Sequence, residues 1–172
     1  MDSFLEQKVS PYLLDETRDW ESVRTFCRDT YSAREVVPLV RNSKPDAVLK
    51  RLKNNDVTFS RFRFGVPTRA ENYDRAAGNI IVVNTLQGSV RHPLTDRTHV
   101  ETKAGESYVV DGSRADYWHV ASGDDLQLNL TIPHQLMEDI SERWFGFIPD
   151  DSLWKKRVVF GGADSVWFAS LN

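Results

Sequence analysis

The sequence predicts a mainly β protein, a β-sandwich or small barrel, with a helix before and a helix after its strands. Short β-branched and apolar stretches recur from residue 47 to residue 131, separated by turn signals such as Asp111-Gly112-Ser113. Residues 126–131 alternate strictly between leucine and polar residues, which is typical of a strand with two different faces. Helical periodicity is confined to the first forty residues and to the segment after Pro133.

Composition limits the class of protein. The 172 residues suffice for one domain, or for one domain with an appendage. With 22 Lys and Arg against 25 Asp and Glu, the net charge is −3. This charge argues against a chain whose whole surface binds nucleic acid or an anionic membrane. The longest apolar run, 80–83, is far below the roughly 20 residues of a membrane-spanning helix, and no secretory signal is visible, so we expect a soluble cytoplasmic protein.

The N-terminal segment, residues 1–46, is expected to contain a helix that packs on the barrel. Asp19 can cap this helix, and apolar residues recur at helical spacing from Trp20 to Cys27. The helix must end before Val36-Val37-Pro38, because a residue that precedes proline favours extended backbone. Cys27 lies on the apolar stripe and is interpreted as a buried structural thiol; as the single cysteine, it also excludes an intrachain disulfide.

The middle segment, residues 47–132, is expected to form the barrel. The turn Asn54-Asn55-Asp56 predicts a hairpin between strands at 47–53 and 57–64. Residues 67–78 are polar and are predicted to be a loop that leads into a strand at 80–86. Further short strands are expected at residues 98–102, 107–110, 115–120 and 126–131.

The C-terminal segment, residues 133–172, is expected to begin with an amphipathic helix. Pro133 suits the first turn of a helix, and Gly146 can close it. The apolar stripe of this helix, which must be buried on its own barrel or on a second subunit, consists of Leu136, Met137, Ile140 and Trp144.

Histidines and arginines are the candidates for chemistry. His99, Glu101 and His119 could form a metal site, although the favoured interpretation is that the histidines are surface or hydrogen-bonded residues. His92 is expected in a turn, and His134, at a helix start, is expected to be exposed. The sequence has neither a Gly-x-Ser-x-Gly elbow nor a phosphate-binding Gly-Lys-Ser/Thr loop.

Two arginines share one face of the predicted strand 57–64. Arg61 and Arg63 alternate with phenylalanines, so both guanidinium groups point the same way. If they faced the barrel interior they would be candidates for binding an effector, since an unpaired buried charge is costly and they would need an anion or several acceptors. The favoured alternative is a solvated face on which they pair with carboxylates. Arg75 lies just before the strand at 80–86.

The order of these elements from about residue 59 to residue 160 resembles the sensory domain of AraC/XylS-type bacterial transcription regulators. The resemblance rests on a series of motifs rather than on one. They are the strand 80–86 followed by Gln87-Gly88, the turn Ala104-Gly105-Glu106 before the strand 107–110, the alternating strand that runs into Ile132-Pro133 and an amphipathic helix, and the closing Trp144-Phe145-Gly146.

The resemblance implies a cupin-like, double-stranded β-helix barrel followed by helices, which serves as the effector-binding and dimerisation half of a regulator without enzymatic activity or a cofactor. DNA would be bound through a helix-turn-helix domain that these residues do not contain. By the same resemblance, effector contacts fall on Arg75, on Tyr117 or Trp118, and on Leu126 and Leu128. A leucine-lined pocket with one cation and one aromatic residue favours a small aromatic or fatty carboxylate over a sugar; alternatively, the leucines are core.

Three functional hypotheses follow. The leading one is an effector sensor that forms a homodimer through the helix after Pro133. The second is a metal-dependent cupin enzyme that uses His99, Glu101 and His119. The third is a protein-interaction domain in which the barrel is only a scaffold. In no case is a membrane partner expected.

Overall fold

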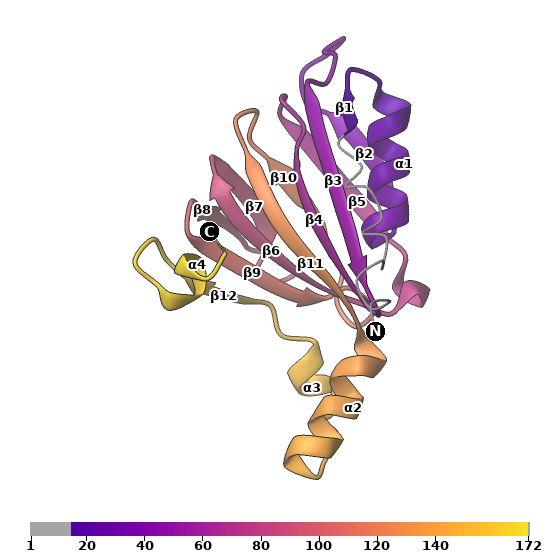
Figure 1. The fold of residues 1–172 in the computed structure, drawn as a ribbon, viewed down its shortest axis with the longest axis vertical. Coiled ribbons are helices and arrows are strands. Elements are labelled where there is room, and N and C mark those ends of the chain that lie inside the picture. Colours follow the sequence, from indigo (N-terminus) through magenta and orange to yellow (C-terminus); the bar gives the residue numbers. More distant parts are fainter. Residues whose placement is uncertain (1–14, 172) are drawn as a thin grey trace, which may run out of the picture.

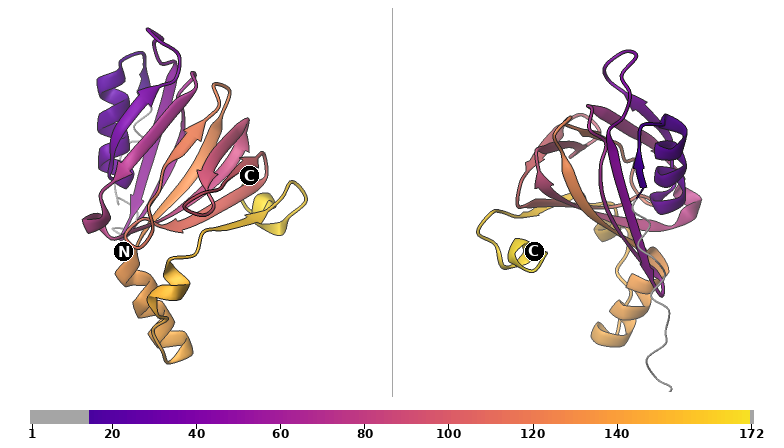
Figure 2. Two further views of the ribbon diagram at one scale, coloured as in Figure 1. Left: turned by 180° about the vertical axis from the view of Figure 1, so that it is seen from behind. Right: turned by 45° about the horizontal axis from the view of Figure 1, so that its top comes forward.

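Antiparallel strand pairing builds two sheets, which curve around a common core in the computed structural model of residues 15–171 (Figures 1 and 2). The strands that the sequence predicted to form a sandwich or barrel thus form a two-sheet, cupin-type barrel. The seven-stranded sheet has the order β1 (Asp15–Thr17), β3 (Ala47–Asn54), β4 (Val57–Arg63), β11 (Leu126–Pro133), β6 (Asn79–Gln87), β9 (Glu106–Asp111) and β12 (Val158–Gly161). The five-stranded sheet has the order β2 (Ala33–Pro38), β5 (Thr68–Tyr73), β10 (His119–Ala121), β7 (Ser89–Pro93) and β8 (His99–Lys103).

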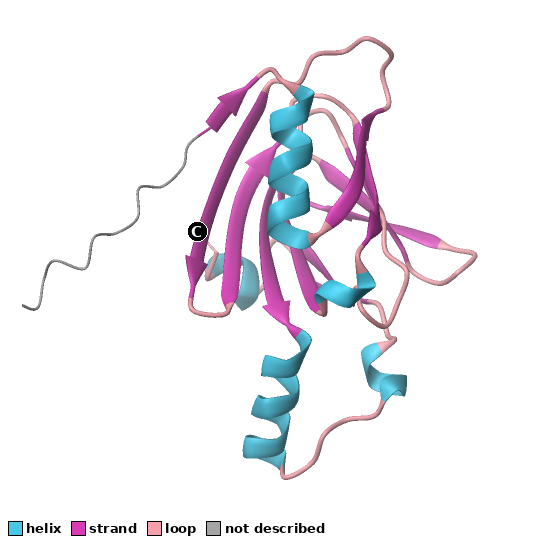
Figure 3. Cartoon of the chain, turned by 90° about the vertical axis from the view of Figure 1, so that its right-hand side faces the viewer, coloured by secondary structure: helices cyan, strands magenta, loops and turns pink. Residues whose placement is uncertain are grey.

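Helix α1 (Trp20–Tyr31) packs against β2 of one sheet and β3 of the other (Figure 3). The Asp19 carboxylate accepts a hydrogen bond from the Ser22 backbone N–H at 2.9 Å, which confirms the predicted cap. Cys27 is fully buried, as predicted. The chain then enters β2, which pairs with β5, so the segment 1–46 supplies a barrel strand as well as a helix. What was expected of residues 1–14 lies outside the described residues.

The predicted hairpin is confirmed as β3 and β4, but two predicted irregular segments are strands. Residues 67–78 were predicted to be a loop, yet they contain β5, which pairs with both β2 and β10. Thr68 and Ala70 are buried there while the alternate residues face outward, so a half-buried strand was hidden by polar composition. His92, expected in a turn, lies in β7 and is fully buried. Conversely, β10 covers only the end of the strand expected at 115–120.

Strand β11 turns its polar face, not its leucine face, towards the barrel interior. Its polar residues Gln127, Asn129 and Thr131 are buried, whereas the leucines between them are only half-buried. The register explains this, because Asn129 lies opposite Ser60 and Val83, which both face the core, and Leu128 lies opposite the exposed Arg61. The Gln127 side chain donates to Asp125 at 2.8 Å and accepts from Asn129 at 3.2 Å, so the buried polar groups support one another.

Aromatic side chains fill much of the space between the sheets. Phe62 and Phe64 have ring centroids 5.1 Å apart, and the His92 imidazole stacks on Tyr108 with centroids 4.2 Å apart. Tyr31 of α1 joins them at 5.9 Å from Phe62. The centre of the barrel is therefore packed with its own rings, and pockets occur towards its edges.

Helix α2 (His134–Phe145) follows β11 directly and projects away from the barrel (Figure 1). Gly146 ends it in the left-handed conformation at φ 75°, as predicted, whereas Pro133 caps the helix as the last residue of β11 rather than opening its first turn. His134 was expected to be exposed and is buried instead, because it bonds to Asp111 at the end of β9. The remaining helices are short: α3 (Asp151–Trp154), α4 (Val166–Ala169) and the 3-10 helix η1 (Arg75–Ala77). Across residues 15–171, none of the helices has the length and apolar character to cross a bilayer.

Candidate functional site

A pocket of about 240 Å³ lies between the end of β5 and the loop that joins β9 to β10. It brings together Arg75, Tyr117 and Trp118, three residues for which the family resemblance implied effector contacts. The other lining residues are Glu71, Asn72, Tyr73, Gly112, Ala115 and Asp116. We call this site the β5 pocket.

Arg75 is the cation of the β5 pocket, and it forms a solvent-exposed ion pair with Asp116. Arg75 begins η1, whose cap is the Asp74 carboxylate accepting from the Ala76 backbone N–H at 3.0 Å. The Arg75 guanidinium donates to the Asp116 carboxylate, and the two side chains are 55% and 84% exposed. An ion pair this exposed contributes little free energy, so a ligand carboxylate can take the place of Asp116 at small cost.

A second arginine compensates the acidic residue of the pocket. Arg69 donates to the Glu71 carboxylate at 2.8 Å, and its guanidinium carbon lies 5.3 Å from the centre of the Trp118 ring. The charge of Glu71 is thus neutralised, and one face of the indole is occupied by a cation–π contact. Arg75 remains the guanidinium that lines the pocket itself.

The backbone is strained at the pocket wall. Asn72 has a φ of 56°, in the left-handed region that asparagine tolerates better than most residues. Its side-chain amide donates to Glu35 on the neighbouring strand β2, which holds this conformation.

A buried network of hydrogen-bonded side chains lies behind the pocket. The Tyr73 hydroxyl is 2.9 Å from Nδ1 of His119, and the Tyr117 hydroxyl is 3.2 Å from Nδ1 of His92. The other nitrogen of His92 is 3.1 Å from the Thr102 hydroxyl. The two tyrosine rings pack together with centroids 4.7 Å apart, and Tyr117 is only 5% exposed, so they line the pocket with the small parts of their rings that the core leaves uncovered.

Burial keeps the side chains of this network uncharged. It lowers the pKa of His119 to about 4 and that of His92 well below its usual value, and it raises the pKa of Tyr73 and Tyr117. Both imidazoles are therefore neutral at pH 7, each with one donor and one acceptor nitrogen. Nε2 of His119 is buried and has no hydrogen-bond partner among the residues that the structure describes.

Four other residues expected to contact an effector lie elsewhere. Arg61 and Arg63 are exposed on the outer face of β4, the arrangement favoured from the sequence, and Arg63 is 3.8 Å from Asp46. Leu126 and Leu128 are half-buried on the leucine side of β11, away from the buried residues of that strand. Leu126 and Leu128 thus do not line the β5 pocket, and tyrosine and tryptophan residues form its apolar wall.

Sequence reasoning missed Tyr73 and Glu71 because it placed them in a loop. The signal was present as the alternation of residues 68–71, in which small or hydroxyl side chains alternate with charged ones. That pattern fits a strand with one buried and one solvated face.

The alternative metal site is not assembled. His99 and Glu101 are exposed on β8, whereas His119 is 1% exposed inside the barrel. Glu101 accepts a hydrogen bond from the Ser89 hydroxyl at 3.0 Å. Among residues 15–171, His, Cys, Asp and Glu side chains form no cluster of three that could hold a metal ion.

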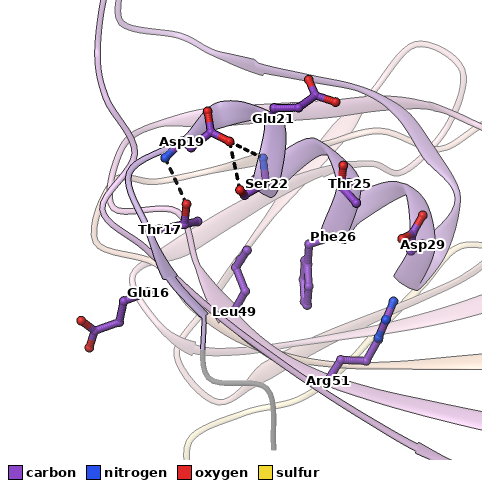
Figure 4. A pocket seen from close by; sticks show the side chains of 10 residues that line it. All are labelled: Glu16, Thr17, Asp19, Glu21, Ser22, Thr25, Phe26, Asp29, Leu49 and Arg51. Carbon is purple, nitrogen blue, oxygen red and sulfur yellow. Dashed lines mark hydrogen bonds between the residues drawn. The ribbon is translucent and has the colours of Figure 1, made fainter.

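A larger cleft of about 550 Å³ lies between α1 and β3 (Figure 4). Phe26 and Leu49 supply apolar surface, and Arg51 extends towards α1 from the sheet. The remaining lining residues are mostly acidic or hydroxylic: Glu16, Thr17, Asp19, Glu21, Ser22, Thr25 and Asp29. This acidic rim disfavours an anionic ligand, and none of the residues predicted to bind an effector lies in it.

Comparisons with known proteins support the fold. No family model matches the sequence. No curated protein matches it either. Among solved structures, the chain is similar to the AraC-like transcriptional activator CuxR, with 16% identity over 75% of this chain and 48% of that one and a TM-score of 0.57. Weaker likenesses are to an HTH_3 family transcriptional regulator from Vibrio cholerae (12% identity, 50% of each chain, TM-score 0.40) and to the cupin domain of Cnp3 from Schizosaccharomyces pombe (12% identity, 55% of this chain and 66% of that one, TM-score 0.42).

The fold and the β5 pocket define a cupin-type barrel protein with a pocket at the edge of its core. The chain spans about half the length of the two regulators. Its barrel is therefore of a kind that also occurs within a longer transcription regulator, the AraC-like activator.

Proposed function

We propose that this chain is the effector-sensing domain of a transcription regulator and acts by binding rather than by catalysis. The observation that supports this most directly is that residues 111–118, the last residue of β9 and the loop after it, include both residues that line the β5 pocket and residues that bond to the segment after the barrel. DNA would be bound by a helix-turn-helix domain outside these residues, in a cytoplasmic regulator.

The effector class follows from the pocket walls. Arg75 offers a cation whose present partner is solvent-exposed, and the aromatic residues Tyr73, Tyr117 and Trp118 supply the apolar part of the lining. The volume of about 240 Å³ is below the roughly 300–1,000 Å³ of sites for drug-sized ligands, so a small ligand fits best. We assign a small aromatic carboxylate, with a short fatty carboxylate as the nearest alternative.

The loop at 111–118 gives a route from the pocket to the C-terminal segment. The Asp116 carbonyl accepts from the Arg157 guanidinium at 3.0 Å, just before β12, and Arg114 donates to Asp151 of α3 at 3.3 Å. A ligand that replaces Asp116 at Arg75 changes the loop that makes these contacts. Ligand binding and the position of α2 and α3 are then linked, because each favours one arrangement of the loop.

The proposed regulator is a homodimer, since regulators of paired DNA half-sites are commonly two-fold symmetric. Its interface includes the α2 stripe of Leu136, Met137, Ile140 and Trp144. The last of these is 73% exposed, and the other three are half-buried.

Calorimetric titration with benzoate and octanoate, and with arabinose as an uncharged comparison, tests the effector class. We expect benzoate to bind, and Arg75→Gln to weaken its binding about tenfold or more, because a charge-assisted hydrogen bond is lost. Arg51→Gln, in the acidic cleft, is the matched control and should leave the affinity unchanged. Binding that is indifferent to Arg75→Gln, or chemical conversion of the bound carboxylate, would contradict the proposal.

Hydrogen exchange tests the proposed coupling. Saturating benzoate should change the exchange of backbone amides in residues 111–118 and at the start of α2, while the distant β3–β4 turn stays unchanged. A ligand effect confined to the pocket residues would show that the pocket binds without signalling.

A further inference from the structure

We propose that α2 and the residues after it, from one subunit, dock on the outer face of β3, β4 and β11 of a second copy of this chain. We call residues 134–151 the arm, and the outward residues of these three strands the outer face. This inference rests on the dimer in the proposed function and assigns the surface on which that dimer forms.

The outer face is apolar along its middle. Strand register places Leu52 opposite Phe59, and Phe59 opposite Leu130. Leu52 and Phe59 are 38% and 37% exposed, and Leu128 and Leu130 are half-buried. A row of large apolar side chains across three neighbouring strands is thus left partly in water, as at a surface that binds another protein.

Positive charges flank this apolar row. Lys50 lies opposite Arg61 across the β3–β4 pair, and Arg63 lies two residues along the same face. Like charges placed opposite one another are unfavourable unless an anion lies between them. Arg63 has a distant partner in Asp46, at 3.8 Å, and Glu16 lies at the sheet edge, opposite Val48. The face is therefore suited to an acidic, apolar partner.

On the other half of this sheet, the same side is covered by a segment of its own chain. The Trp167 indole N–H donates to Asn84 of β6 at 2.8 Å and to Ser107 of β9 at 3.1 Å. Its ring also packs against Phe160, with centroids 5.5 Å apart. The C-terminal segment thus covers β6 and β9 on this side of the sheet, whereas the apolar residues of the outer face remain partly exposed.

The arm has the complementary composition. Between His134 and Asp151 it contains five carboxylates and one arginine. Glu138 and Asp151 already bond to His134 and Arg114 of their own subunit, whereas Asp139 and Glu142 are exposed on one side of α2. Large apolar side chains near its tip are exposed: Trp144 73%, Phe145 67%, Phe147 60% and Ile148 48%. The 12 residues of α2 make a helix about 18 Å long, which spans three to four strands at their spacing of about 4.8 Å.

The arm cannot reach the outer face of its own subunit. Helix α2 begins at the residue after β11, and it continues away from the sheets (Figure 1). Folding back would need a linker between the strand and the helix, and the cap at Pro133 leaves none. A second copy supplies the same acidic arm and the same basic face, so a two-fold dimer can satisfy both contacts at once.

Sedimentation velocity of charge-reversal variants tests this interface. We expect the wild-type chain to be a dimer, and R61E/R63E or D139K/E142K each to raise its dissociation constant about tenfold or more. Combining all four reversals should restore the dimer, because the charges again match. R91E/R97E, which reverses exposed charges outside the outer face, is the control and should remain dimeric.

Cross-linking identifies the two surfaces directly. A mixture of L128C and E142C chains should form a disulfide-linked heterodimer under mild oxidation, and native Cys27 should not react because it is fully buried. A monomeric wild type, failure of the combined reversal to restore the dimer, or no heterodimer in the mixture would each overturn the proposal. Benzoate titration of R61E/R63E separates this failure from that of sensing, since neither arginine lines the β5 pocket.

Discussion

The Nδ1 atom of His134 lies 2.5 Å from Oδ2 of Asp111, so the first residue of α2 is tied to the last residue of β9. Both side chains are almost fully buried. On its other nitrogen His134 meets Glu138 of the same helix at 2.9 Å, and the edge of its ring meets Trp154 of α3. The buried contacts of His134 therefore connect the barrel, the arm and α3.

Removing the contacts of His134 should lower the free energy of unfolding of the whole chain. In a His134→Ala variant, Asp111 keeps its bonds from Ser113 but loses its imidazole partner in a buried site. We expect a loss of about 3 kcal/mol in the free energy of unfolding, measured with urea, because a buried polar pair is broken on one side. Gln135→Ala, on the exposed side of the same turn, should change it by less than about 0.5 kcal/mol. Equal effects of the two variants would contradict the assigned role.

Acid should weaken the fold through the buried histidines. Burial lowers the pKa of His119 to about 4, below the usual value of 6.5, so the unfolded chain takes up a proton first as the pH falls. Stability contributed by neutral His119 is complete above pH 6.5 and is lost towards pH 4, at up to about 1.4 kcal/mol per pH unit. Urea unfolding at pH 4.5 and 6.5 should show this loss, and His119→Asn should reduce it.

Asp125 supplies an internal comparison of opposite sign. Burial raises its pKa to about 7, so the folded chain holds a proton that the unfolded chain releases above its usual value of 3.8. The protonated form favours folding at low pH, and this contribution is lost as the pH rises from 3.8 through 7. Asp125→Asn should therefore make the acid sensitivity steeper. If Asp125→Asn and His119→Asn changed the slope in the same direction, the assignment would be wrong.

The Cys27 thiol should be inert in the native state. It is fully buried, its sulfur is 3.0 Å from the Tyr31 hydroxyl, and burial raises its pKa to about 12. Reaction with a thiol reagent such as dithionitrobenzoate should be negligible until the chain unfolds, and should then follow the unfolding curve measured by circular dichroism. Fast labelling of the folded chain would show that α1 opens locally.

Replacing a polar residue inside the barrel by leucine should be harmful. Gln127 is fully buried and bonds both Asp125 and Asn129, so Gln127→Leu leaves two buried groups short of partners. We expect a loss of about 1–3 kcal/mol in unfolding free energy. Gln87→Leu, at an exposed position of β6, is the control. Stabilisation by Gln127→Leu would instead support a leucine-lined interior.

The sequence was informative where local chemistry decides the structure. The cap at Asp19, the hairpin of β3 and β4, and the end of α2 at Gly146 depend on neighbouring residues, and all three were predicted. The mainly β class followed from turn spacing. The orientation of β11 could not be predicted, because a strict alternation shows two faces but not which one the other sheet will cover.

The candidate site shows the same division. Arg75, Tyr117 and Trp118 were singled out through a family resemblance, and the structure places them in one pocket. Tyr73 was missed because β5 looks polar in sequence, and the burial of His134 was missed because its partner lies 23 residues away. Contacts between distant strands decide both cases, and local patterns do not contain them.

The direct passage from β11 into α2 makes the helix a lever. With no hinge residue between them, a change in the twist of the strand turns the rod as a whole, and over about 18 Å a tilt of about 10° moves the far end by about 3 Å. A small displacement at the pocket would thus become a larger displacement at the far end of α2, where the exposed aromatic side chains could gain or lose contact with another surface.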